Sequence, residues 1–421
     1  MKVSLSTDLY ELTMAQSYLE NNKKGKAVFS LFVRKLPENR NFLISCGLET
    51  LIGKIIEFKF DEESLLYLKS LNIFKDSFLD YLEEYEFRGN IYAIPEGRIV
   101  FENEPIVQIE GPLPDVQILE TVVINIIHFQ TLIASKAVRS YLVSGDRLLI
   151  DFGLRRAHSL ESGIYAARAS YIAGFAGTSN LEAGRIYKIP VYGTVAHSYI
   201  MIFEKEEEAF LAFARSFPQR AIHLIDTYDT IKAIEKVIKL AKEGMPVMGV
   251  RIDSGNIVNL TKEVRRRLKE EGLENVKIIV SGGVDEYSIE KWLGEGAEID
   301  AFGIGTKFIT SSDAPYLDMA YKLVEYEGKP KYKTSPGKET FPFKRQVVRF
   351  YENSVMRKDI VTKDFNKEEG EKLVKQVIKD GNLIVKLPSL KEIREVLLEE
   401  IDKLPEELKG LKKAHYEVII D

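Results

Sequence analysis

The segment VMGVRIDSGN, Val247 to Asn256, decides the fold. It begins with an apolar run suited to a buried strand and ends in charged and turn-forming residues. A helical segment from Val258 to Glu271 follows, and then a second run of the same kind, KIIVSGG, from Lys277 to Gly283. A strand, a helix and a further strand in this order predict a right-handed βαβ unit with parallel strands.

The same alternation extends on both sides, from Arg147 to Ile309. The candidate strands are RLLIDFG from Arg147, GTSN from Gly177, VYGT from Val191, AIHLID from Ala221, VMGVRID from Val247, KIIVSGG from Lys277 and DAFGIGT from Asp300. Helical segments such as Tyr228 to Glu243 and Glu286 to Leu293 separate them. Periodicity alone does not distinguish a closed (β/α) barrel from an open doubly wound sheet. The number of units, about seven, favours an irregular (β/α) barrel.

The remaining sequence predicts two further parts around this α/β barrel, which we place at residues 115–310. Residues 1–114 are expected to form an α+β domain, with a helix opening near Leu9, where Asp8 and Glu11 have the spacing of a capping pair. Residues 311–421 combine β-strands and helices. They are expected either to pack on the N-terminal domain or to form a small third domain.

Composition excludes several classes of protein. The chain has 421 residues, 45% hydrophobic and 29% charged, which suits a globular enzyme of two or three domains or a barrel with additions. Its net charge of −5 gives no basic face for nucleic acid or a membrane surface. A single cysteine, Cys46, excludes an intrachain disulfide and a thiolate zinc cluster. We detect neither a signal-peptide pattern nor an apolar run of about 18 residues, and expect a cytoplasmic protein.

Charged residues follow two of the candidate strands. Arg155 and Arg156 come directly after RLLIDFG, where planar guanidinium groups suit a phosphate or a carboxylate. The alternative is a surface pair engaged in salt bridges. Arg251 and Asp253 lie in an apolar run, where an unpaired charge is costly. They form a structural ion pair or point into a polar barrel mouth, where the acid could hold ribose hydroxyls or Mg²⁺.

Two late strands end in closely spaced glycines, Gly282 with Gly283 and Gly303 with Gly305. Glycine lets backbone N–H groups approach phosphate oxygens, and the loops after the last strands of a barrel frequently bind phosphate. Each pair alone also fits ordinary turn chemistry.

The segment VYGTVAHSY, Val191 to Tyr199, places His197 between an apolar run and a predicted helix. A lone histidine is most often a cap or a core hydrogen-bond partner. In α/β proteins, catalytic residues are often found where a strand is followed by a helix. A neutral imidazole at such a position is a competent nucleophile toward a phosphoryl group. His197 is therefore a candidate catalytic residue.

Six motifs in sequence order carry a resemblance to a known family. They are STDLYELTMA from Ser6, DFGLRRA from Asp151, GTSN from Gly177, YGTVAHS from Tyr192, RIDSG from Arg251 and GIGT from Gly303. The chain up to about Thr310 resembles the nicotinate phosphoribosyltransferases, which implies a fold like that of the type II phosphoribosyltransferases. The last hundred or so residues carry no motif of this kind.

The resemblance implies an ATP-dependent transfer of phosphoribose from 5-phosphoribosyl-1-pyrophosphate to nicotinate in NAD biosynthesis or salvage. Mg²⁺ and ATP are then required, and His197 matches the histidine that becomes phosphorylated. A matching aromatic pair, Phe152 and Tyr10 of a second subunit, would stack on the pyridine ring, which implies a homodimer. Three further residues match positions that contact nicotinate or its carboxylate: Arg155, Thr194 and Arg251. Pyrophosphate is the alternative partner for Arg155. Asp253 matches a residue that binds the ribose, and the 5-phosphate site is matched by Gly282, Gly283, Gly303, Gly305 and Thr306.

Ser179 bears on the choice of pyridine. Relatives that act on nicotinamide place an acidic residue at the matching position, whereas a serine hydroxyl can donate to a carboxylate, so we expect nicotinate. The alternatives are a quinolinate or nicotinamide phosphoribosyltransferase and, from a different class, a non-catalytic barrel that binds a phosphorylated metabolite. ATP-stimulated turnover of nicotinate discriminates among them.

Overall fold

The computed structural model describes residues 3–333, 340–367 and 369–421. The chain divides into two compact units, Met1–Ser135 with Ala314–Asp421, and Lys136–Asp313. One boundary falls inside a long helix, α6 (Glu120–Ser144), rather than before it at residue 114. N-terminal and C-terminal segments thus share the first unit, and the second is one continuous stretch of chain.

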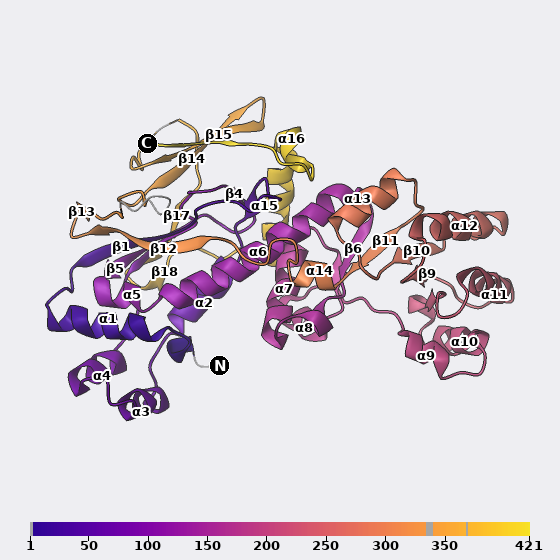
Figure 1. The fold of residues 1–421 in the computed structure, drawn as a ribbon, viewed down its shortest axis with the longest axis horizontal. Coiled ribbons are helices and arrows are strands. Elements are labelled where there is room, and N and C mark those ends of the chain that lie inside the picture. Colours follow the sequence, from indigo (N-terminus) through magenta and orange to yellow (C-terminus); the bar gives the residue numbers. More distant parts are fainter. Residues whose placement is uncertain (1–2, 334–339, 368) are drawn as a thin grey trace. The chain divides into compact units, whose positions relative to one another are not determined.

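The first unit is built on an antiparallel sheet of seven strands in the order β13-β12-β1-β5-β3-β17-β18 (Figure 1). Its β1 (Lys26–Val33) pairs with β5 (Val107–Pro112) on one side and with β12 (Met319–Tyr326) on the other. All residues of β1 except the first are buried, so both faces of this strand are covered. This explains why six of its eight residues are apolar and do not alternate with polar ones.

Smaller elements complete the first unit. Its other sheets are β16-β14-β15-β19 and the pair β2-β4. The remaining strands are β2 (Leu43–Ile44), β3 (Asn90–Ala93), β4 (Ile99–Val100), β13 (Lys329–Pro330), β14 (Gln346–Glu352), β15 (Val355–Thr362), β16 (Glu371–Lys372), β17 (Lys375–Lys379), β18 (Asn382–Leu383) and β19 (Glu417–Ile420). The helices are η1 (Val3–Leu5), α1 (Leu9–Glu20), α2 (Leu48–Ile56), α3 (Glu62–Ser70), α4 (Asp76–Glu83), α5 (Leu113–Gln117), α15 (Leu390–Asp402) and α16 (Glu406–Lys409).

Helix α1 begins at Leu9, where the capping pair predicted it, with Asp8 in the N-cap position. The predicted capping bonds are wrong, because the Asp8 side chain caps no backbone N–H of the helix. Asp8 instead accepts a hydrogen bond from the Thr121 hydroxyl at 2.8 Å, and Glu11 accepts one from the Thr121 N–H at 2.9 Å. Both carboxylates therefore bond to Thr121, which is 110 or more residues away in the sequence, and not to the backbone N–H groups at the start of their own helix.

The helical stretch Leu113–Ser144 is long and apolar enough, by length and composition, to cross a membrane. This corrects the expectation that no such run exists. However, 61% of its most apolar window is buried inside the protein. That burial is typical of a core helix in a globular protein.

The second unit contains one parallel sheet of six strands in the order β7-β6-β11-β10-β9-β8. The strands are β6 (Leu148–Asp151), β7 (Gly177–Thr178), β8 (Ile222–Leu224), β9 (Gly249–Ile252), β10 (Lys277–Val280) and β11 (Ala301–Ile304). The mixed α/β class with a parallel sheet and an N-terminal domain is confirmed, but six strands replace the expected seven. VYGT contributes only an isolated bridge between Val191 and Thr178, and no ladder between described residues joins β7 to β8.

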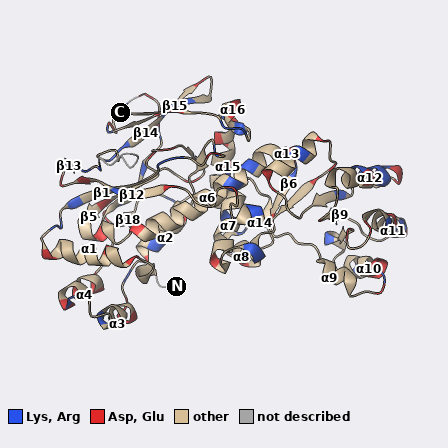
Figure 2. Cartoon of the chain, viewed as in Figure 1, with Lys and Arg blue, Asp and Glu red and all other residues tan. Residues whose placement is uncertain are grey.

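Helices follow most of these strands, as the alternation predicted. They are η2 (Leu154–Arg156), α7 (Leu160–Ile172), α8 (Leu181–Tyr187), α9 (His197–Met201), α10 (Glu206–Ser216), η3 (Pro218–Arg220), α11 (Thr230–Lys242), α12 (Ile257–Glu270), α13 (Glu286–Gly294) and α14 (Thr306–Ile309). Helix α12 buries an apolar stripe that includes Val264 and Leu268. Residues of both charges are interspersed along the helix (Figure 2), and Arg266 forms ion pairs with Glu263 and Glu270.

Candidate active site

All six strands of the second unit are parallel, so the loops that follow them meet at one edge of the sheet. Except for Tyr10, every candidate residue predicted from the sequence belongs to this unit. Most of the candidates follow the strands, on the loops after β6, β7, β9, β10 and β11 or at the start of α14, whereas Arg251 and Gly303 lie within β9 and β11. Thr194 lies on the segment that precedes α9, and His197 is the first residue of that helix. The carboxyl edge of the sheet is therefore the candidate site.

Arg251 is the centre of a hydrogen-bonded cluster. Its Nε donates to the Ser281 hydroxyl at 2.9 Å, and one Nη donates to the Val195 carbonyl oxygen at 2.9 Å and to the Thr194 hydroxyl. The other Nη lies 3.4 Å from Oδ1 of Asp253. The ion pair with Asp253 is thus present, and the same guanidinium also ties the segment before His197 to the sheet.

Asp226 is a site residue that the sequence analysis did not select. It follows β8, and its Oδ2 accepts hydrogen bonds from the Asp253 N–H at 2.9 Å and the Ser254 hydroxyl at 2.7 Å. Its Oδ1 is buried and has no hydrogen-bond partner among the described residues. The run AIHLID ends in this acid as VMGVRID ends in Asp253, and that parallel was the available signal.

His197 is the first residue of α9 and stands beside this cluster. Its Nδ1 lies 3.1 Å from the hydroxyl of Thr227, and its Nε2 lies 3.9 Å from Oδ2 of Asp253. The side chain is 38% exposed, so the ring is held on one side and open to a reactant. Helix α9 has only five residues and its N-cap, Ala196, offers no side-chain bond. Neighbouring side chains, rather than a long helix dipole, must therefore balance charge on the ring.

Two glycine positions are explained by close approach. A side chain at Gly303 would collide with the Phe152 ring, 2.4 Å from the added carbon, so this glycine makes room for the aromatic ring. Gly282 has a φ of +81°, and a side chain there would meet the backbone oxygen of Asp253 at 2.1 Å. Gly283, beside it, has a φ of +70° and open space around it. The loop after β10 therefore exposes backbone close to Asp253.

The other candidates of the second unit form no side-chain bond to this cluster within the described residues. Arg155 and Arg156, on η2, are exposed, and neither forms an ion pair within the part of the chain that the structure describes. Ser179 is partly exposed and its N–H donates to the backbone oxygen of Asp151 at 2.8 Å. Thr306 begins α14 after Gly305. The alternative interpretation, in which these two arginines form surface salt bridges, is therefore not observed among the described residues.

Tyr10 lies in the first unit, on the first turn of α1, and is 45% exposed. Its neighbour Leu9 is 54% exposed. An aromatic and an aliphatic side chain lying exposed next to each other are available for contact with another molecule.

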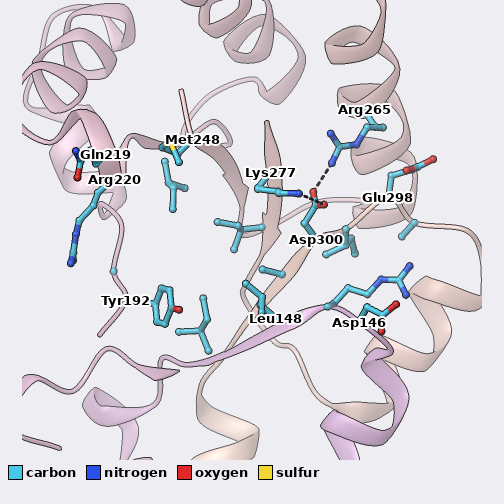
Figure 3. Close-up of a pocket in the computed structure, with 18 of the residues that line it drawn as sticks. Asp146, Leu148, Tyr192, Gln219, Arg220, Met248, Arg265, Lys277, Glu298 and Asp300 are labelled. Carbon is cyan, nitrogen blue, oxygen red and sulfur yellow. Dashed lines mark hydrogen bonds and ion pairs between the residues drawn. The ribbon is translucent and has the colours of Figure 1, made fainter. Parts of the chain in front are cut away.

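A cavity of about 840 Å³ lies at the opposite, amino edge of the same sheet. Residues at or just before the strand starts line it, among them Leu148, Met248 and Lys277. Figure 3 shows Arg265 and Lys277 both directed at Asp300. None of the residues in the predicted site lines this cavity, so its size does not mark the candidate site.

No group of three or more His, Cys, Asp or Glu side chains with the arrangement of a metal site occurs within the described ranges. The carboxyl edge nevertheless holds two neighbouring acids, Asp226 and Asp253, and the buried Oδ1 of Asp226 has no partner there. Two carboxylates suit Mg²⁺ when phosphate oxygens and water supply the other ligands.

Comparison with known proteins shows the family to which the chain is similar. The family model of the nicotinate phosphoribosyltransferase N-terminal domain matches residues 5–128, and that of the nicotinate phosphoribosyltransferase family matches residues 147–381. Nicotinate phosphoribosyltransferase pncB2 of Mycobacterium tuberculosis is 43% identical over 417 residues, covering 98% of this chain and 90% of that protein. Nicotinate phosphoribosyltransferase of Bacillus subtilis is 38% identical over 363 residues, covering 84% and 74%.

Two solved structures extend the similarity to three dimensions. Human nicotinic acid phosphoribosyltransferase superposes with a TM-score of 0.87 at 26% identity, covering 99% of this chain and 97% of that one. Nicotinate-nucleotide pyrophosphorylase from Pyrococcus furiosus superposes with a TM-score of 0.78 at 27% identity, covering 96% of each chain. With nearly the whole length matched in sequence and in fold, this chain belongs to the nicotinate phosphoribosyltransferase family.

Proposed function

We propose that the protein transfers the phosphoribosyl group of 5-phosphoribosyl-1-pyrophosphate to nicotinate, giving nicotinate mononucleotide and pyrophosphate for NAD biosynthesis or salvage. We further propose that ATP hydrolysis drives this transfer through a phosphohistidine at His197. The observation that carries the second proposal is the setting of the ring, fixed at Nδ1 by Thr227 and open at Nε2 near Asp253.

His197 acts as a nucleophile toward the γ-phosphoryl group of ATP. Its neutral imidazole attacks the phosphorus, the bond to the β-phosphate oxygen breaks, and ADP leaves. Arg251, which is bonded to Thr194 and Val195, three and two residues before the histidine, holds that segment in place. Its positive charge, close to that segment, also favours an added phosphoryl group.

Nicotinate lies against Phe152, whose ring occupies the space left by Gly303. Ser179 and Thr194 donate hydrogen bonds from their hydroxyl groups to the pyridine carboxylate. The positive charge of Arg251 or Arg155 balances the negative charge of that carboxylate. Tyr10 of a second subunit covers the other face of the ring, where an aromatic pair adds about 0.5–1.5 kcal/mol beyond burial. The active enzyme is accordingly a homodimer.

The phosphoribosyl donor lies along the loops after β9, β10 and β11. Asp253 binds the ribose hydroxyls. The 5-phosphate is bound by the backbone of four glycines and one threonine: Gly282, Gly283, Gly303, Gly305 and Thr306. Asp226 and Asp253 would hold Mg²⁺ together with the donor's phosphates, and when bound this ion neutralises the leaving pyrophosphate. The transfer passes through an oxocarbenium-like state, so positioning and charge dominate and no proton-transfer residue is needed.

We place the protein in the cytoplasm as a soluble enzyme, with small phosphorylated molecules, rather than nucleic acid or a membrane, as its partners. The interspersed charges of both signs along helices such as α12 support this assignment. The buried apolar window in Leu113–Ser144 supports it as well.

Incubation with γ-labelled ATP tests the histidine. The wild-type protein is expected to acquire an acid-labile label, and His197→Ala is expected to lose it. His415→Ala, which removes an exposed histidine of the first unit, is the matched control and should keep the label. Labelling of His197→Ala at the wild-type level would overturn the assignment.

A turnover assay with nicotinate, nicotinamide and quinolinate, each with and without ATP, tests the reaction. We expect nicotinate to be the preferred acceptor and ATP to raise the rate. Turnover of quinolinate with release of CO₂ and without an effect of ATP would favour the decarboxylating alternative. Binding of 5-phosphoribosyl-1-pyrophosphate without turnover of any acceptor would favour a non-catalytic barrel.

A further inference from the structure

Asp151, the last residue of β6, is a fully buried carboxylate at the edge of the candidate site. One oxygen accepts the Gly153 N–H at 2.7 Å, and the other accepts the Thr178 hydroxyl at 2.7 Å. Burial raises the pKa of this carboxyl to about 6, although both hydrogen bonds act in the opposite direction. An ionised group is costly in such a place, so its presence calls for a reason beyond packing.

Each of the two donors is adjacent in the chain to a residue proposed to contact nicotinate. Gly153 directly follows Phe152, and Thr178 directly precedes Ser179. The backbone carbonyl oxygen of Asp151 also accepts the Ser179 N–H at 2.8 Å. Asp151 thus holds its own loop through the Gly153 N–H and is bonded twice to the segment that carries Ser179.

Thr178 relays this connection one step further. It is fully buried, and its hydroxyl oxygen accepts the Asn180 N–H at 3.0 Å while the hydroxyl hydrogen goes to Asp151. Side chains alternate along a strand, so Asp151 faces the opposite side of the sheet from Phe152. Both Asp151 and Thr178 are therefore placed to act behind the ligand surface rather than on it.

We propose that Asp151 and Thr178 are positioning residues that set the separation between Phe152 and Ser179, and so the fit of the pyridine ring and its acid group. This inference rests on the proposed placement of nicotinate against those two residues. A carboxylate suits the role because its two oxygens accept from both loops at a fixed spacing, whereas an amide offers a single acceptor.

Thr178→Val tests the proposal, because it removes the hydroxyl at nearly constant volume. We expect the KM for nicotinate to rise about 10- to 100-fold, the range in which small misplacements act, with the KM for 5-phosphoribosyl-1-pyrophosphate within about twofold. Thr178→Ser keeps the hydroxyl and should restore the wild-type KM.

Thr261→Val is the matched control for the loss of a buried threonine hydroxyl. Thr261 is also fully buried in the second unit, and its hydroxyl donates to the Val258 carbonyl oxygen and accepts the N–H of Glu298, a residue that lines the amino-edge cavity. Its valine variant should lower the melting temperature about as much as Thr178→Val and leave both KM values unchanged. Equal kinetic effects of the two valine variants would overturn the proposal, as would a Thr178→Ser variant as impaired as Thr178→Val.

Asp151→Ala gives a second, independent measurement, and it should raise the KM for nicotinate at least as much as Thr178→Val. Phe152→Leu and Ser179→Ala separate this inference from the placement on which it rests. If these two variants leave the KM for nicotinate unchanged, the placement fails. If they raise it and neither Thr178→Val nor Asp151→Ala does, the positioning role fails and the placement stands.

Discussion

The two edges of the parallel sheet use charge in different ways. At the carboxyl edge, Asp151, Asp226 and Asp253 each bond to backbone or hydroxyl groups, and Asp253 also pairs with Arg251 at 3.4 Å. At the amino edge, charged groups pair with one another, as Asp300 does with Arg265 and Lys277 (Figure 3). In the proposed function, the first edge positions loops for a ligand, and the second holds the strand starts together. Equal substitutions at the two edges should therefore have unequal consequences.

Removing one cation from each edge should give the largest contrast. Arg251→Met breaks four contacts of a mostly buried guanidinium, and we expect kcat/KM for nicotinate to fall about 100- to 1000-fold. Lys277→Met removes a cation that is 63% exposed and 3.5 Å from Asp300, so kcat/KM should stay within about threefold. Steady-state kinetics of both variants measure the contrast, and a comparable loss in both would remove it.

Arg265→Met should show the reverse pattern, with lost stability and retained activity. Its guanidinium donates to the carbonyl oxygens of Glu274 and Val276 at 2.9 Å and pairs with Asp300. Leaving these buried acceptors without a donor should lower the free energy of unfolding by about 2–4 kcal/mol. Urea unfolding followed by the fluorescence of the single tryptophan, Trp292, reports on this unit.

Arg266→Met is the control for that experiment, since Arg266 lies on the same helix but is exposed. It should change the unfolding midpoint much less than Arg265→Met does. A drop in kcat/KM for Arg265→Met at a temperature where the protein is fully folded would mean that the amino edge also shapes the site.

Ser179→Asp should change the choice of acceptor at the carboxyl edge. A carboxylate at this partly exposed position would repel the acid group of nicotinate and raise its KM about 10- to 100-fold. The neutral Ser179→Asn variant separates charge from size and should raise the KM less. Competition between nicotinate and nicotinamide measures the shift, and an unchanged preference for nicotinate would refute the role of Ser179.

The smallest expected effect is the dependence of stability on pH through Asp151. Burial raises the pKa of this carboxyl to about 6 in the folded protein, from 3.8. The folded state therefore binds this proton more tightly than the unfolded state does. The stabilisation is complete below about pH 4 and is lost as the pH rises through about 6.

Asp151→Asn lacks this titration. Relative to wild type, its free energy of unfolding should increase by about 1–2 kcal/mol between pH 5 and pH 8. Urea unfolding at the two pH values checks the difference. A constant offset between the two proteins over that range would contradict the assignment of this proton to Asp151.

The sequence was sufficient for the elements whose signal is local. The predicted strands from Arg147, Ala221, Val247, Lys277 and Asp300 all appear, because a short apolar run between turn residues reports burial directly. VYGT has the same composition but makes only the bridge from Val191 to Thr178. Burial can be recognised in a sequence, whereas the presence of a pairing partner depends on where the neighbouring strand ends.

The candidate site divides in the same way. Arg251, Asp253 and His197 were visible because charged or reactive residues beside apolar runs are unusual. Asp226 and Thr178 were missed because their roles consist of hydrogen bonds to residues 27 positions away in the chain. Asp8 failed for the same reason, since its carboxylate bonds to Thr121 rather than to its own helix. Contacts between residues that are far apart in the chain produce no periodic pattern in the sequence.

The incomplete pairing between β7 and β8 has a consequence for exchange with solvent. The chain after Val191 bonds to Thr178 of β7, and within the described residues it forms no ladder with β8. The amide hydrogens from Gly193 to Ala196 should therefore exchange with deuterium much faster than those of β9 and β10, which are paired on both sides. The stretch leading to His197 is then held to the sheet by the side chain of Arg251 and not by a ladder of backbone hydrogen bonds.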